Sequence, residues 1–108
     1  HKLSNLTAIV DYNKLQSYGP TADIQDIEPL ADKWKSFGFS VREVDGHHVD
    51  ELRKAFNALP YDAEKPSAII CHTIKGKGIP FAEGEPTWHH KSRLPADQIA
   101  EIYKALGA

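Results

Sequence analysis

Three polar side chains stand where they could bind a metal ion, a phosphate group and a proton. Asn13 follows a short apolar run, Lys75 lies in a segment with two glycines, and His89 follows a tryptophan in a loop rich in glycine and proline. An amide oxygen suits a hard cation such as Mg²⁺, which also takes backbone carbonyl, carboxylate and phosphate oxygens. A lysine among glycines suits phosphate, and a histidine suits proton transfer near neutral pH.

Each of these residues also has an ordinary structural interpretation, which the sequence leaves open. Asn13 could cap a turn, as asparagine often does. The segment from Thr73 to Gly78 could be a flexible solvated turn, and it lacks the glycine spacing and the Ser or Thr of a Walker loop. Trp88 could pack the loop and leave His89 exposed.

Other metal and thiol chemistries fit the sequence poorly. The six histidines include the adjacent pairs 47–48 and 89–90, and no two have the i, i+4 spacing of a helical zinc site. A single cysteine excludes an internal disulfide and a Cys-based zinc site. We expect Cys71 to be a small buried side chain of a strand.

Composition narrows the class of protein. The 108 residues suit one domain or part of one, and no apolar run approaches the roughly 18 residues that a membrane helix needs. The net charge of −2 argues against a general nucleic-acid or anionic-membrane binder. The cysteine count fits a reducing, cytoplasmic location. The chain has no methionine and begins with His1, so we expect a segment of a longer protein.

Apolar periodicity predicts the elements that position these residues. Strands are expected over 6–10, 39–44 and 67–72, helices over 30–37, 48–59 and 96–106, and a long loop over 12–27. This order favours right-handed crossovers and a parallel sheet. The predicted fold class is therefore α/β, part of a doubly wound parallel sheet: a three-strand βαβαβ segment with flanking helices. Ligands of such sheets bind beyond the carboxyl ends of the strands, which selects the loops at 11–16, 45–48 and 72–90.

Taken together, these loops resemble the transketolase family of thiamine diphosphate enzymes. The match is to the later half of the diphosphate-binding domain, and it resembles most closely the small amino-terminal subunits of split transketolases. The resembling segments cover nearly the whole chain in the family's order: Leu3–Leu6, Asp11–Gln16, Lys33–Trp34, Phe37–Phe39, Val44–His47, Lys65–Ser67, Thr73–Gly78 and Trp88–His89.

The resemblance implies a thiamine diphosphate-binding fold and a role for each candidate residue. Thiamine diphosphate would bind through Mg²⁺ or another divalent cation, held by the Asn13 side chain and the Leu15 carbonyl. Lys75 would approach the diphosphate. His89 would lie near cofactor and substrate as the catalytic histidine. Residues 1–94 would form the later half of the cofactor domain, and residues 95–108 a terminal helix leading out of it.

The resemblance also implies what must come from elsewhere. The family's Gly-Asp-Gly aspartate and the pyrimidine-binding domain are absent from these residues, so we expect the segment alone to be inactive. His90 and Ser92 replace the family's Gly and Pro after the histidine. The complete enzyme would move a two-carbon ketol unit between sugar phosphates, in carbohydrate metabolism of the pentose phosphate type. A homodimer or a heterotetramer with a second chain is expected.

Two alternatives differ in function. One is another thiamine diphosphate ketolase or synthase with a different substrate. The other is a non-enzymatic, receiver-like α/β module with Asp11 and Lys75 at strand ends. A receiver usually has acidic neighbours beside its first-loop aspartate, and Asp11 has no adjacent acid.

Overall fold

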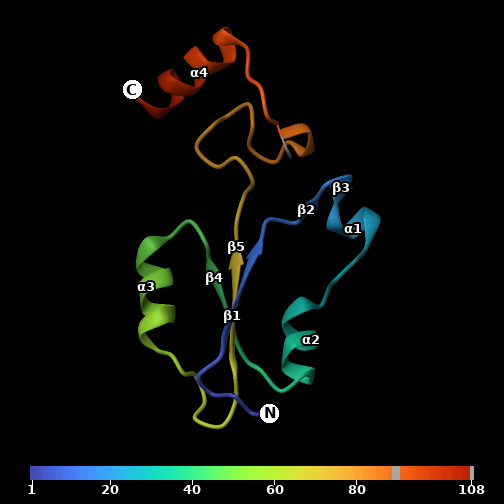
Figure 1. The fold of residues 1–108 in the computed structure, drawn as a ribbon, viewed down its shortest axis with the longest axis vertical. Coiled ribbons are helices and arrows are strands. Elements are labelled where there is room, and N and C mark those ends of the chain that lie inside the picture. Colours follow the sequence, from blue (N-terminus) through green and yellow to red (C-terminus); the bar gives the residue numbers. More distant parts are fainter. Residues whose placement is uncertain (89–90, 108) are drawn as a thin grey trace.

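The computed structural model describes residues 1–88 and 91–107 and centres on three parallel strands. These are β1 (Thr7–Tyr12), β4 (Ser40–Asp45) and β5 (Ser67–His72), in the spatial order β1-β5-β4. The register is level, because the first residues of all three strands are aligned, as are the last. Their carboxyl ends therefore meet at one edge of the sheet (Figure 1).

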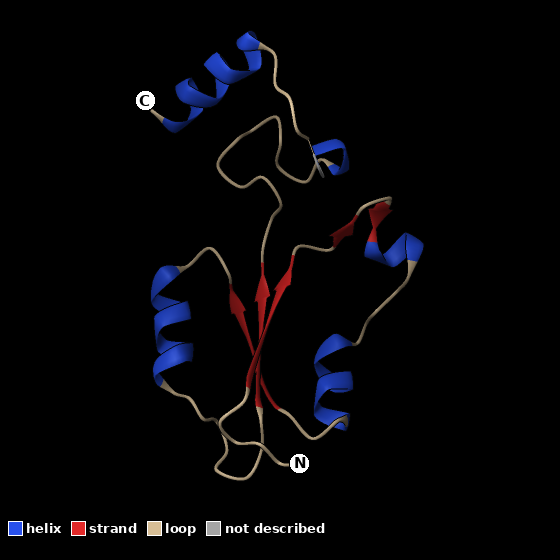
Figure 2. Cartoon of the chain, in the orientation of Figure 1, coloured by secondary structure: helices blue, strands red, loops and turns tan. Residues whose placement is uncertain are grey.

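The central strand β5 is the buried spine of the fold. Ala68, Ile69 and Ile70 are 0% exposed, which confirms that this apolar run belongs to a strand covered on both faces. Helices α2 (Leu30–Ser36) and α3 (Val49–Asn57) lie on opposite sides of the sheet (Figure 2). The chain crosses from β1 to β4 in one direction and then returns to β5 in the other. Because both crossovers are right-handed, the helices that make them must lie on opposite faces of the sheet. The predicted half of a doubly wound sheet is confirmed.

A small core joins α3 to the sheet. Ala55 packs with Ile69 and Cys71, and four partly buried residues surround them: Val44, Leu52, Leu59 and Tyr61. The Tyr61 hydroxyl donates to the Ala55 carbonyl at 3.1 Å, and burial raises the pKa of this phenol. Cys71 is 7% exposed, as expected, and burial also raises the pKa of its thiol. The core is therefore held by β5 and the inner face of α3.

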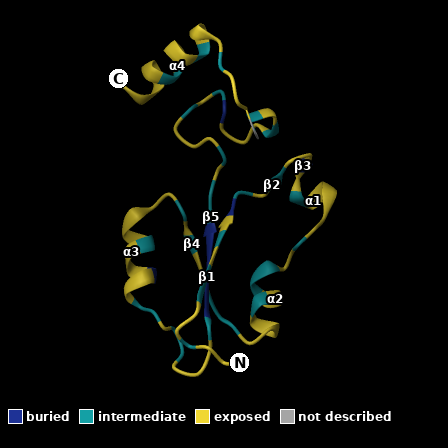
Figure 3. Cartoon of the chain, viewed as in Figure 1, coloured by how far each residue is buried: buried dark blue, intermediate teal, exposed yellow. Residues whose placement is uncertain are grey.

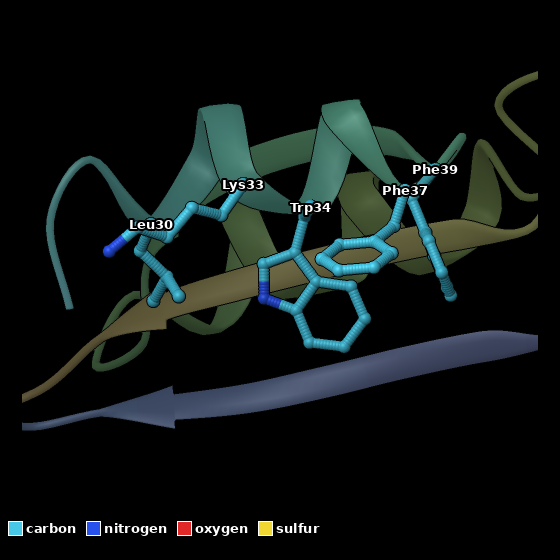
Figure 4. Close-up of a pocket in the computed structure, with 5 residues that line it drawn as sticks. All are labelled: Leu30, Lys33, Trp34, Phe37 and Phe39. Atoms are coloured by element: carbon cyan, nitrogen blue, oxygen red, sulfur yellow. The ribbon is translucent and has the colours of Figure 1, made fainter.

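The apolar face predicted for α2 differs from the observed one at Phe37. Phe37 follows the end of the helix and is 83% exposed, although periodicity placed it in the buried stripe. Trp34 packs edge-on against Phe39, with ring centroids 4.8 Å apart. A cavity of ≈ 380 Å³ lies between these side chains (Figure 4), lined by Leu30, Lys33, Trp34, Phe37 and Phe39.

Beyond the carboxyl edge of the sheet, the chain runs out to the helix α4 (Ala96–Leu106), which contains no buried residue (Figure 3). Its predicted apolar face is exposed, with Tyr103 at 59% and Leu106 at 61%. The radius of gyration is 17.1 Å, against about 13 Å for a compact domain of 100 residues. The molecule is elongated because this arm stands away from the sheet. Among residues 1–88 and 91–107, no helix has the length and apolar character needed to cross a membrane.

The prediction of a long loop over residues 12–27, after β1, is wrong in part. It contains a small hairpin, β2 (Leu15–Gln16) with β3 (Gly19–Pro20), followed by the short helix α1 (Thr21–Ile24). The elements are too short to show an apolar period. They rest on local contacts, such as the bond from the Tyr18 amide to the Gln16 side chain at 3.3 Å.

Substituting Ile69 by alanine should lower the free energy of unfolding by about 2–5 kcal/mol, because a fully buried side chain leaves a cavity in the central strand. Urea denaturation measures this change. Val49→Ala is the control, since Val49 is 65% exposed and its loss should change stability little. Equal effects of the two substitutions would contradict the assignment of β5 as the spine of the core.

Candidate functional site

The turn after β1 holds Asn13 and Leu15 in a fixed relation. The Asn13 side-chain oxygen accepts the Leu15 amide at 2.9 Å, so the turn-capping interpretation describes this structure. Lys14, between them, adopts a left-handed φ of 62°. The Lys14 carbonyl accepts the Thr21 amide at 2.9 Å and the Thr21 hydroxyl at 3.3 Å. The turn is therefore fixed by one hydrogen bond within it and two to Thr21.

This geometry leaves two neutral oxygens for a metal. Leu15 pairs with Pro20 in the antiparallel ladder, and Pro20 has no amide hydrogen to donate. Lys14 and Thr21, which flank this pair, are hydrogen-bonded to each other, so Leu15 and Pro20 form a non-hydrogen-bonded pair and the Leu15 carbonyl is directed away from β3. The Asn13 oxygen keeps a second lone pair beside its bond to Leu15. The donor set fits a hard cation such as Mg²⁺.

Over residues 1–88 and 91–107, no cluster of three or more His, Cys, Asp or Glu could hold a metal ion. Asp11, the nearest acid in sequence, accepts a hydrogen bond from the Thr73 hydroxyl. A metal ion held by Asn13 and Leu15 would therefore need carboxylate or phosphate oxygens from other groups.

A hydrogen-bonded chain that the sequence did not reveal crosses the same edge. Lys14 Nζ donates to His72 Nδ1 at 2.6 Å, and His72 Nε2 lies 2.8 Å from Glu43 Oε2. Beside this chain, the His47 ring accepts the Ile74 amide at 2.7 Å. These groups border a cavity of ≈ 400 Å³ lined by Lys14, Asp45, His47, His72, Thr73, Ile74 and Lys77. The cavity lies at the edge that the sequence predicted, but its lysine and histidine walls were not foreseen as a group.

The strand β1 is tied to the segment before α2 by a second unforeseen contact. The Tyr12 hydroxyl donates to Glu28 Oε1 at 2.6 Å, and Glu28 Oε2 accepts the Leu30 amide at 2.8 Å. These bonds hold the pKa of Glu28 below its ordinary value, with the Tyr12 bond the larger cause. The same bond raises the pKa of Tyr12. The end of β1 that carries Asn13 is thereby fixed on two sides.

The glycine-rich segment containing Lys75 is an ordered loop. The Lys75 carbonyl accepts the Gly84 amide at 2.9 Å. Gly76 has a φ of 74°, and a β-carbon there would lie 2.5 Å from the Ala82 carbonyl oxygen. The Gly78 amide donates to Glu83 Oε1 at 3.0 Å. These hydrogen bonds close the loop on itself.

Glu83 pairs with the Gly78 amide and the Lys77 ammonium, two groups that could otherwise contact a phosphate. It accepts the Gly78 amide, and its carboxylate lies 3.6 Å from Lys77 Nζ. The hydrogen bond from the Gly78 amide lowers the pKa of Glu83, and the nearby charge of Lys77 is a smaller cause. Of the two lysines in the loop, Lys77 is thus paired within it, and the proposal of phosphate contact rests on Lys75.

The loop that leads to the predicted catalytic histidine is packed by Trp88. This residue ends the 3-10 turn η1 (Pro86–Trp88), and its ring centroid lies 5.5 Å from that of Phe81. Lys91 Nζ stands 4.6 Å from the centre of the Trp88 ring. Loop packing by Trp88 is confirmed. His89 lies outside the described residues, so its predicted role stays a prediction.

The level strand ends and the polar loops beyond them define a ligand-binding α/β domain of the doubly wound class. The family described as "Transketolase, thiamine diphosphate binding domain" matches residues 1–108. The chain belongs to the transketolase family. Membership removes the receiver-like interpretation, and it confirms the resemblance found in the sequence.

Known relatives agree with this assignment. The chain is 40% identical over 90 residues to an apulose-4-phosphate transketolase subunit of Phocaeicola vulgatus, covering 83% of this chain and 32% of the relative. It is 45% identical over 89 residues to "6-deoxy-6-sulfo-D-fructose transketolase subunit SqwG" of a Clostridium species, covering 82% and 32%. The chain therefore spans about a third of the length of these relatives.

A solved structure shares the fold. The transketolase of Campylobacter jejuni superposes with a TM-score of 0.84 at 28% identity, covering 99% of this chain and 16% of that one. The arrangement of sheet, helices and extended arm is therefore that of a part of a transketolase.

Gly76→Ala should destabilise the loop more than Gly78→Ala. Both glycines have positive φ, so either alanine costs about 1–2 kcal/mol of backbone strain. Only the β-carbon at position 76 meets the Ala82 carbonyl, whereas position 78 has nothing within 4 Å. Hydrogen exchange of the Gly84 amide and urea denaturation measure the difference. Indistinguishable variants would contradict the observed loop closure.

The carboxyl of Glu83 should titrate below the ordinary glutamate value, as followed by the chemical shift of its carboxyl carbon. Its lowered folded pKa means that the stabilisation is complete above the unfolded pKa and is lost as the pH falls through the folded pKa. The protection factor of the Gly78 amide against hydrogen exchange should fall over the same window. Glu83→Gln should remove this pH dependence of the protection factor. A normal titration midpoint would count against the Gly78 contact.

Proposed function

We propose that this chain is the metal- and diphosphate-binding part of a transketolase-type enzyme that moves a two-carbon ketol unit from a ketose phosphate to an aldose phosphate. The observation that carries the proposal is the turn from Asn13 to Leu15. It presents two neutral oxygens at the carboxyl edge of a parallel sheet, where a divalent cation and the diphosphate of thiamine diphosphate would bind. When bound, the cofactor's thiazolium ring would supply an electron sink for cleavage of a carbon–carbon bond of the ketose.

The residues of the chain have distinct parts in this proposal. Asn13 Oδ1 and the Leu15 carbonyl hold Mg²⁺ or another divalent cation. Lys75, in a loop ordered by Gly76 and Gly84, brings a positive charge to the diphosphate. His89 hydrogen-bonds the substrate oxygens. Residues 1–94 form the later half of the cofactor domain, and residues 95–108 lead out of it.

Groups outside these residues complete the proposed enzyme. The metal still needs a carboxylate, and the described residues contain no cluster of three or more His, Cys, Asp or Glu that could hold an ion. The two relatives are each named as one subunit of a transketolase, which supports a partner chain that brings the pyrimidine-binding domain. We propose a homodimer or a heterotetramer located in the cytoplasm. The isolated segment would be inactive.

Asn13→Ala should weaken the apparent affinity for Mg²⁺ by about 100-fold in the presence of thiamine diphosphate, since a direct ligand is lost and even supporting residues cost about 10–100-fold. The measurement is calorimetric titration of the full-length protein with its partner chain. Asn57→Ala is the matched control, because Asn57 is an exposed residue at the end of α3. Unchanged Mg²⁺ affinity in Asn13→Ala would contradict the proposed metal role, and absence of binding by the unsubstituted protein would contradict the proposed function.

A further inference from the structure

The three strands of the sheet are linked at their carboxyl ends by one continuous hydrogen-bonded chain. Lys14 follows β1, His72 ends β5, and Glu43 lies in β4. Lysine only donates and an ionised carboxylate only accepts. His72 must therefore accept from Lys14 at Nδ1, at 2.6 Å, and donate from Nε2 to Glu43, at 2.8 Å. The contacts select one neutral tautomer of the ring.

The lysine end of this chain lies between the two proposed metal ligands. Lys14 has a φ of 62°, a conformation that lysine seldom adopts. Its side chain folds back over the sheet, with Nζ 3.3 Å from the Tyr12 carbonyl and 4.2 Å from the centre of the Tyr12 ring. The contact with His72 holds it there. The backbone conformation of Lys14 sets the position of Asn13 relative to Leu15. A contact that holds the Lys14 side chain therefore affects both the Asn13 side-chain oxygen and the Leu15 carbonyl.

We propose that His72 and Glu43 are positioning residues for the metal site. They hold Lys14 so that its left-handed backbone keeps Asn13 Oδ1 and the Leu15 carbonyl aimed at one cation. Neither His72 nor Glu43 touches the metal in this arrangement. The inference rests on the proposed function, because it assumes that the turn binds a divalent cation. The His72 and Glu43 side chains are 40% and 49% exposed, so water competes for these contacts and the effect should be moderate.

The test uses the full-length protein with its partner chain and thiamine diphosphate at saturation. His72→Leu removes both ring nitrogens, whereas His72→Gln retains one acceptor and one donor. We expect His72→Leu to weaken the apparent Mg²⁺ affinity by about 10-fold, the lower end of the range for residues that orient metal ligands. His72→Gln should restore most of it. Calorimetry gives the affinity, and kinetics should show a raised half-saturating Mg²⁺ concentration with kcat unchanged at saturating Mg²⁺.

A second pair of variants separates positioning from simple charge attraction. Glu43→Gln loses the charge and keeps an acceptor for His72, so it should bind Mg²⁺ as the unsubstituted protein does. Glu43→Leu should resemble His72→Leu. Asp50→Asn is the control, because it removes an exposed carboxylate that pairs with Arg53 on α3, far along the chain from the turn. If His72→Leu does not fold, the Glu43 pair carries the test by itself.

The outcomes distinguish this inference from the proposed function. Unsubstituted protein that fails to bind Mg²⁺ and thiamine diphosphate would show that the proposed function is wrong. Tight binding by the unsubstituted protein, with equal affinity in His72→Leu and Glu43→Leu, would overturn the positioning role alone. Equal losses in Glu43→Gln and Glu43→Leu would also overturn it, because charge rather than the hydrogen bond would then be responsible.

Discussion

The structure depends on the burial of β5 in level parallel register with β1 and β4. Because the three strands begin and end together, Tyr12, Asp45 and His72 lie at one edge, and every loop with unusual polar residues leaves the sheet there. Burial of the central strand on both faces requires a helix on each side, which α2 and α3 supply. The apolar run of β5 thus decides where the chemistry of the chain can be.

At that edge the described residues offer neutral oxygens, lysines and separate carboxylates, without a cluster of three or more His, Cys, Asp or Glu that could hold a metal. The turn around Asn13 is preorganised by its own hydrogen bonds, and the loop around Gly76 is closed by Glu83 and Gly84. Preorganised groups lose little freedom when a ligand arrives. Such a surface suits one side of a metal–diphosphate site whose remaining ligands come from other parts of a transketolase.

Much of the fold was predictable because its causes are local. The four apolar residues 68–71 marked the buried strand, and apolar spacing marked the helices on either side. The chain from Lys14 through His72 to Glu43 was not predictable, because its contacts join residues 58 and 29 positions apart. The exposed Phe37 and the exposed face of α4 were also missed, since periodicity shows that a face is apolar without showing what covers it. The sequence around Asn13 supported both a turn-capping and a metal-binding interpretation. The two are compatible, because the side-chain oxygen has two lone pairs and the Leu15 amide uses one of them.

A crystal structure of the full-length protein with its partner chain, thiamine diphosphate and Mn²⁺ in place of Mg²⁺ tests the central claim most directly. Anomalous scattering locates the ion. We predict an ion bound to Asn13 Oδ1 and the Leu15 carbonyl at about 2.0–2.2 Å, with Lys14 still in its left-handed conformation. An ion bound elsewhere, with the Asn13 oxygen in contact only with the Leu15 amide, would contradict the account.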